Sequence, residues 1–116
     1  MNLSDLLNKG GFIQVNKYLV DRIGLKEAVL LGCLCSKHSY WVNQGRLGVD
    51  GFFYCEAKNF KKETSLSAKQ QLAAFDNLER LGLIQTDYRG IPRAKYFKIN
   101  IESLENFLIN AECDKQ

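Results

Sequence analysis

A chain of 116 residues has the usual size of a single domain, and its 46% hydrophobic and 25% charged residues are typical of a folded globular protein rather than a disordered one. The longest apolar stretch, residues 28–35, is far too short to cross a bilayer, and no basic segment followed by an apolar one opens the chain, so we expect a cytoplasmic protein without a membrane partner. The net charge of +3 is modest, but nine of the sixteen basic residues lie between residues 56 and 98. The positive charge is therefore concentrated in the middle of the chain.

The first quarter of the chain contains short predicted elements separated by glycines. The pattern predicts a helix over residues 4–9, ended by Gly10 and Gly11, and then a short strand over residues 12–15. Asn16 can cap a helical turn that runs to Ile23, where Gly24 supplies a stop.

The longest predicted helix covers residues 25–41. Its apolar residues fall on two faces, with Ala28, Leu31 and Cys35 on one and Leu30, Leu34 and Trp41 on the other. Such a helix is buried on two sides. Its second side can be covered by the terminal segments of the same chain or by a second copy. Because two-fold dimers are the commonest soluble assemblies, we expect a homodimer formed through this helix and the terminal helices.

The middle of the chain begins with a glycine-containing loop over residues 42–51. We expect a short aromatic strand over residues 52–55, a short helix over 56–64 and a turn at Ser65 and Leu66. The next segment has the clearest signature, because Ser67 and Gln70 fit the capping box S-x-x-Q at the start of a helix. Gly82 ends that helix.

On a helical wheel, the helix that begins at Ser67 has two different faces. The face predicted to point inward holds Ala68, Gln71, Leu72, Phe75, Leu78 and Gly82. The face predicted to point outward carries mostly long hydrogen-bonding side chains and no large apolar residue, namely Lys69, Gln70, Ala73, Asn77 and Arg80.

Two strands with a basic tip follow, over residues 83–88 and 94–99, around a turn that contains Gly90 and Pro92. Residues 88–98 include four cations and no acidic residue, which is a candidate electrostatic footprint for a polyanion. Asn100 is predicted to cap an amphipathic helix over about residues 101–111.

The order of these elements predicts an α+β, mainly helical fold: a winged helix-turn-helix with extra N- and C-terminal helices. We expect one domain over residues 1–116, with the helix-turn-helix at about 56–81, the wing at about 83–99 and the C-terminal helix at about 101–111. In this fold a helix enters the DNA major groove and the ribbon reaches neighbouring phosphates or the minor groove. The predicted function is binding of double-stranded DNA.

Residues 15–99 resemble the winged helix domain that begins replication proteins of phages and plasmids from Gram-positive bacteria, the replisome-organiser and DnaD-like group. The segments that carry the resemblance are 23–28, 50–54, 64–67, 78–84 and 90–92, followed by 96–99. This resemblance implies binding of origin or promoter DNA, in replication initiation or gene control, and self-association.

Candidate DNA contacts come from three places. The second helix supplies Ser67, Lys69, Gln70, Asn77 and Arg80, the wing supplies Arg89, Arg93 and Lys95, and the preceding helix supplies Lys61 and Lys62. We expect Asn77 and Lys69 to read bases and the wing cations to hold phosphates. The capping box competes for the side chain of Gln70.

The sequence predicts no enzyme, cofactor or metal. Cys33 and Cys35 lie in an apolar run, Cys55 and Cys113 are remote from each other, and His38 has no neighbouring motif that pairs it with a nucleophile. One non-enzymatic alternative competes with DNA binding. The two-sided helix and the acidic tail favour a protein-interaction module that uses the winged helix to bind a host or replisome protein.

Overall fold

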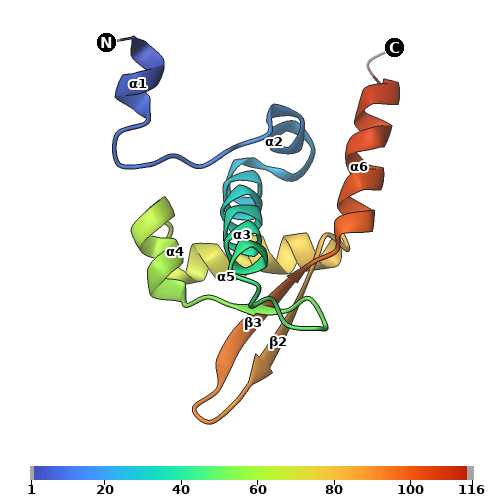
Figure 1. Ribbon diagram of the computed structural model, residues 1–116. Coiled ribbons are helices and arrows are strands. Elements are labelled where there is room, and N and C mark those ends of the chain that lie inside the picture. Colours follow the sequence, from blue (N-terminus) through green and yellow to red (C-terminus); the bar gives the residue numbers. More distant parts are fainter. Residues whose placement is uncertain (1, 115–116) are drawn as a thin grey trace.

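The structure is a computed structural model that describes residues 2–114, with side chains up to residue 109. Within these residues there are six helices and three strands. Their order is α1 (Leu3–Leu7), α2 (Lys17–Ile23), α3 (Leu25–Asn43), β1 (Phe53–Tyr54), α4 (Ala57–Thr64), α5 (Ala68–Arg80), β2 (Ile84–Arg89), β3 (Ala94–Ile99) and α6 (Ile101–Asp114) (Figure 1). The predicted α+β, mainly helical class is confirmed. No helix in the described part is long and apolar enough to cross a membrane.

The three strands form one antiparallel sheet in the order β1, β3, β2. The hairpin of β2 and β3 is the predicted wing, and it projects beyond the helices (Figure 1). Helices α4 and α5 form the predicted helix-turn-helix. Ser65 turns the chain between them in the left-handed region, at φ 63°, and the predicted capping box starts α5. These features together are those of a winged helix-turn-helix fold.

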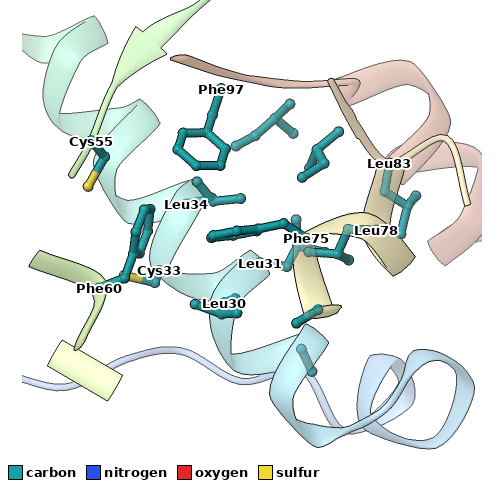
Figure 2. Packing of buried hydrophobic residues seen from close by; sticks show 14 of the residues in the cluster. Leu30, Leu31, Cys33, Leu34, Cys55, Phe60, Phe75, Leu78, Leu83 and Phe97 are labelled. Carbon is teal, nitrogen blue, oxygen red and sulfur yellow. The ribbon is translucent and has the colours of Figure 1, made fainter. Parts of the chain in front are cut away.

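A cluster of three phenylalanine rings connects the helix-turn-helix to the sheet (Figure 2). Phe60 of α4, Phe75 of α5 and Phe97 of β3 lie with ring centroids 4.8 to 5.5 Å apart. All three are at most 3% exposed. Because apolar burial is worth roughly 25 cal/mol per Å², these rings contribute a large share of the free energy that holds the three elements together.

The central helix is α3, and it is buried on more than one side, as its sequence predicts. Leu30, Leu31 and Leu34 are at most 1% exposed, and α2, α4, α5 and β3 all contact this helix. Helix α6 reaches the same region, because Phe107 packs edge-on against Tyr18 of α2 at 6.0 Å. Segments of the same chain therefore cover α3.

The prediction of a strand over residues 12–15 is wrong. This segment is extended but pairs with no strand of the sheet, and Phe12 is 71% exposed. It crosses α3 instead, where Gly32 has no side chain and the carbonyl of Gln14 comes close to the helix. An apolar run becomes a strand only where a neighbouring strand can pair with it, and α3 occupies that place here.

The predicted faces of α5 are partly wrong as well. Its buried residues are Gln71, Ala74, Phe75 and Leu78, spaced as one helical stripe. Leu72 is 50% exposed and Ala68 is exposed, although both were expected to point inward. Asn77, expected outward, is half-buried. The helix is rotated relative to this expectation because Gln71 bonds to the backbone of α4 and of the turn, while Asn77 bonds to Glu27 of α3.

The close approach of Gln14 to α3 generates a stability prediction. A methyl group at position 32 would overlap the carbonyl oxygen of Gln14 and lie 3.3 Å from Ile13 Cγ2. Gly32→Ala should therefore lower the free energy of unfolding by about 1–3 kcal/mol, although alanine favours helices. Denaturant unfolding followed by circular dichroism measures the change.

Ser36→Ala is the matched control, because Ser36 lies one turn later on α3 and is exposed. It should change the free energy of unfolding by less than about 0.5 kcal/mol. If Gly32→Ala instead raised stability by the amount expected at an open helix position, the segment would not pack on α3 as described.

Candidate nucleic-acid interface

The exposed face of α5 is the surface that a winged helix offers to the DNA major groove. It carries Lys69 in the first turn, Asp76 in the middle and Arg80 in the last turn, with Leu72 and Ala73 between them. Lys69 and Arg80 are about 16 Å apart along the helix axis, at 1.5 Å per residue. The face therefore has a cation near each end and a carboxylate between them. Sequence reasoning missed Asp76, although its position on the wheel lies within about 40° of those of Lys69 and Arg80.

Ser67 and Gln70 are occupied with starting the helix. The Gln70 backbone N–H donates to Ser67 Oγ at 3.1 Å, and the Ser67 N–H donates to Gln70 Oε1 at 2.9 Å. Each side chain thus satisfies a backbone donor that the first turn leaves without a helical partner. The capping geometry leaves the Gln70 Nε2 amide as that side chain's available donor.

Asn77 links α5 to the central helix. Its Nδ2 donates to Glu27 Oε1 at 3.1 Å, and its Oδ1 accepts from Arg80 Nη2 at 3.4 Å. The side chain lies on the edge of α5 that faces α3, not on the exposed face. Sequence reasoning could not find this bond, because Glu27 is 50 residues away in the chain. Arg80 is exposed but is oriented in part by this contact.

Arg89 is held by the protein itself on the outer face of the sheet. Its guanidinium pairs with Asp50 at 2.7 Å and with Asp87 at 2.9 Å, and it lies 4.4 Å from the ring centroid of Phe52. The hydrogen bond from the Phe52 backbone N–H has the largest effect in lowering the pKa of the Asp50 carboxyl, and this guanidinium lowers it further. Arg89 therefore fixes the loop before β1 to the wing, and its charge is already neutralised.

Arg93 and Lys95 lie on the inner side of the wing, the side that faces α5. The Arg93 guanidinium lies 4.8 Å from the ring centroid of Tyr88, and Lys95 Nζ lies 5.2 Å from that of Phe75. Neither forms an ion pair with a carboxylate in the described part of the chain. These two cations are therefore available to an anion from outside.

The two candidate lysines of α4 also lie at the surface. Lys61 and Lys62 are exposed in the last turn of α4, where a cation interacts favourably with the negative end of the helix. Neither pairs with a carboxylate among the described side chains. Their neighbour Lys58 is bound to Glu56 at 3.0 Å.

The structure brings together some of the predicted contacts and separates others. The first half of α5 and the inner side of the wing face each other across a pocket that Ala68, Leu72, Arg93 and Lys95 all line. Lys69 follows Ala68 at the same end of α5, whereas Arg80 lies at the other end. Arg89 is on the opposite face of the sheet, because it pairs in register with Ala94 while Tyr88 pairs with Lys95.

Cys33, Cys55 and His38 are built into the packing. Cys33 Sγ donates to Glu63 Oε2 at 2.8 Å, and burial together with this hydrogen bond raises the pKa of the Cys33 thiol to about 12. Burial raises the pKa of Cys55 to about 11. His38 packs edge-on against Phe53 at 6.0 Å. Among the described side chains, which do not include that of Cys113, no three His, Cys, Asp or Glu residues form a metal-binding group.

One solved structure to which this chain is similar is described as "N-Terminal domain of DNA binding protein". The two share 13% sequence identity with a TM-score of 0.63, over 85% of this chain and 80% of that chain. At this identity the similarity shows a shared fold. No family model and no curated protein matches the sequence.

The raised thiol pKa values predict slow alkylation, because the thiolate is the reactive form. At pH 8, iodoacetamide should label Cys33 and Cys55 at least about a hundredfold more slowly in the folded protein than in urea. Mass spectrometry of tryptic peptides measures both rates, and the urea sample is the internal control. Equal rates in the folded and unfolded protein would contradict the buried, protonated state of these thiols.

Proposed function

We propose that this protein binds double-stranded DNA through the exposed face of α5 and the inner side of the wing. The observation that carries the proposal is the position of Lys69, Arg93 and Lys95, three cations without an ion pair among the described residues, on the two elements that a winged helix presents to DNA. The similar solved structure, a domain of a DNA-binding protein, supports the same reading.

The contacts differ in what they contribute. Lys69 lies in the first turn of α5, the part of a recognition helix that reaches base edges, so we assign it base contact. Arg93 and Lys95 hold phosphates, with further phosphate contacts from Arg80 and from Lys61 and Lys62 at the end of α4. Base reading by Asn77 stays a prediction, and its bond to Glu27 favours a structural role.

For the biological process, the resemblance to replisome organisers and DnaD-like proteins supports a role in replication initiation or gene control of a phage or plasmid. Such a protein works in the cytoplasm. This step rests on the order and spacing of the sequence segments that carry the resemblance.

One observation favours the alternative function, a protein-interaction module that binds a host or replisome protein. The exposed face of α5 holds Leu72, which is 50% exposed, and the carboxylate of Asp76 in its middle. An apolar side chain and a negative charge suit a protein partner better than a phosphate backbone. The DNA-binding experiment below decides between the two functions.

Lys69→Ala and Arg93→Ala should affect DNA binding differently. Lys69→Ala should cost about 1–3 kcal/mol of discrimination at one position of the preferred site, because it removes a base contact. Arg93→Ala should weaken binding to all sequences alike and reduce the slope of log affinity against log salt by about 0.9, because it removes one phosphate contact. Fluorescence anisotropy with labelled duplexes at several salt concentrations measures both.

Lys17→Ala is the control for loss of one positive charge, since Lys17 is exposed on α2, away from the wing (Figure 1). It should leave both affinity and salt slope close to those of the parent. If all three variants bound random duplex as well as the parent at low salt, α5 and the wing would not be a DNA interface. The protein-interaction function would then be the better account.

We also propose that the protein forms a homodimer through its terminal helices. Segments of the same chain cover α3, and exposed apolar side chains also lie on the N-terminal helix. Helix α1 has no buried residue, stands away from the other helices (Figure 1), and exposes Leu3 and Leu7 by 77% and 76%. A second copy would remove these leucines from water.

Light scattering at tens of micromolar tests the dimer. The parent should have twice the 13.2 kDa mass of the chain, and a variant with Leu3→Asp and Leu7→Asp should have the monomer mass. Both leucines are exposed, so the variant should keep the parent's circular dichroism spectrum. A parent that is strictly monomeric would overturn the proposal.

A further inference from the structure

A pocket of about 370 Å³ lies between the start of α5, helix α4 and the inner side of the wing. Five of its fourteen lining residues are aromatic, namely Phe60, Phe75 and Phe97 with Tyr54 and Tyr88. Arg93 and Lys95 also line it. The volume falls in the range of small-molecule sites, and aromatic walls favour a flat apolar body as the occupant.

Lys95 is a partly buried cation that lacks an anionic partner. Its Nζ lies 5.2, 5.4 and 5.8 Å from the ring centroids of Phe75, Phe97 and Tyr88. It forms no hydrogen bond or ion pair among the described residues. A partly buried charge without a counter-charge is costly, and aromatic faces offset only part of the cost. An anion in the pocket would complete the site.

The side-chain oxygen of Gln71, Oε1, is a second polar atom that lacks a partner. The residue is 3% exposed, and its Nε2 donates to the carbonyl oxygens of Ala57 at 3.1 Å and Leu66 at 3.0 Å. Its Oε1 accepts no hydrogen bond from the described residues. Every fully buried side-chain polar atom among those residues has a partner, so this oxygen is not fully buried. The oxygen therefore keeps a small contact with solvent, and Gln71 lines the pocket. It offers a fixed acceptor to a donor from outside.

The one carboxylate that lines the pocket is already satisfied. Glu56 accepts from Tyr54 Oη at 2.6 Å and pairs with Lys58 at 3.0 Å. The hydrogen bond from Tyr54 has the largest effect in lowering the pKa of the Glu56 carboxyl, and the hydrogen bond from Lys58 lowers it further. The two cations therefore dominate the electrostatics of the pocket.

We propose that this pocket binds a small flat aromatic anion whose ring carries an N–H donor. The ring lies among the aromatic walls, the N–H donates to Gln71 Oε1, and the carboxylate or phosphate pairs with Lys95 and Arg93. Two sources share this chemistry, a free aromatic acid and a nucleotide. Because the same cations face DNA in the proposed function, an occupied pocket should weaken DNA binding, and that consequence alone rests on the proposed function.

Isothermal titration calorimetry without DNA tests the binding itself. Indole-3-acetate has the ring, the N–H and the anion, and it should bind. Naphthalene-1-acetate lacks the N–H and should bind about three- to tenfold more weakly, the worth of one hydrogen bond. Tryptamine has the indole ring but a positive charge, and it should show no measurable binding. Thymidine 5′-monophosphate is the nucleotide probe. If it binds more tightly than indole-3-acetate, the natural ligand is a nucleotide. If it binds more weakly, the natural ligand is a free aromatic acid.

Lys95→Met is the decisive variant, because methionine keeps the length of the side chain and packs well against rings. It should weaken binding of the preferred probe at least about tenfold, the effect of losing a charge-assisted contact. Lys98→Met is the matched control on the same strand, since Lys98 lies on the opposite face of the sheet, near Phe52. Absence of binding by both indole-3-acetate and thymidine 5′-monophosphate, or equal binding by Lys95→Met and the parent, would overturn the proposal. Anisotropy with a labelled duplex, with and without the probe, then tests the DNA consequence separately.

Discussion

The contact of Phe60, Phe75 and Phe97 is the interaction on which the rest of the structure depends. The three rings come from α4, α5 and β3, which are the two helices of the helix-turn-helix and the central strand of the sheet. Neither a short helix nor an isolated two-stranded hairpin is stable alone in water. The shared cluster therefore fixes at once the angle between the two helices and the distance of the wing from α5.

The charges of the interface divide into those that the fold uses and those that it leaves available. Arg89 and Asn77 are part of the frame, because one ties the loop before β1 to the wing and the other ties α5 to α3. Lys69, Arg93 and Lys95 lie around one end of α5. The frame thus places the available cations without supplying carboxylates that would neutralise them.

Local signals in the sequence predicted much of the fold. The capping box at Ser67, the stop at Gly82 and the alternation in residues 94–99 depend on neighbours a few positions away, and the elements they predict are present. The strand at residues 12–15 and the faces of α5 depended on what each segment packs against. The candidate site was predicted less well, because the Glu27 partner of Asn77 and the Asp50 partner of Arg89 are distant in the chain. Burial of Lys95 among three rings likewise arises only when β3 and α5 meet.

The capping box has a consequence for the thermodynamics of any association through α5. Ser67 and Gln70 bond to each other before a partner arrives, so the first turn, which carries Lys69, is already helical in the free protein. Ordering one residue costs roughly 1–2 kcal/mol of conformational entropy. A complex formed on this turn does not incur that cost, and its affinity should therefore depend weakly on temperature-induced fraying of α5.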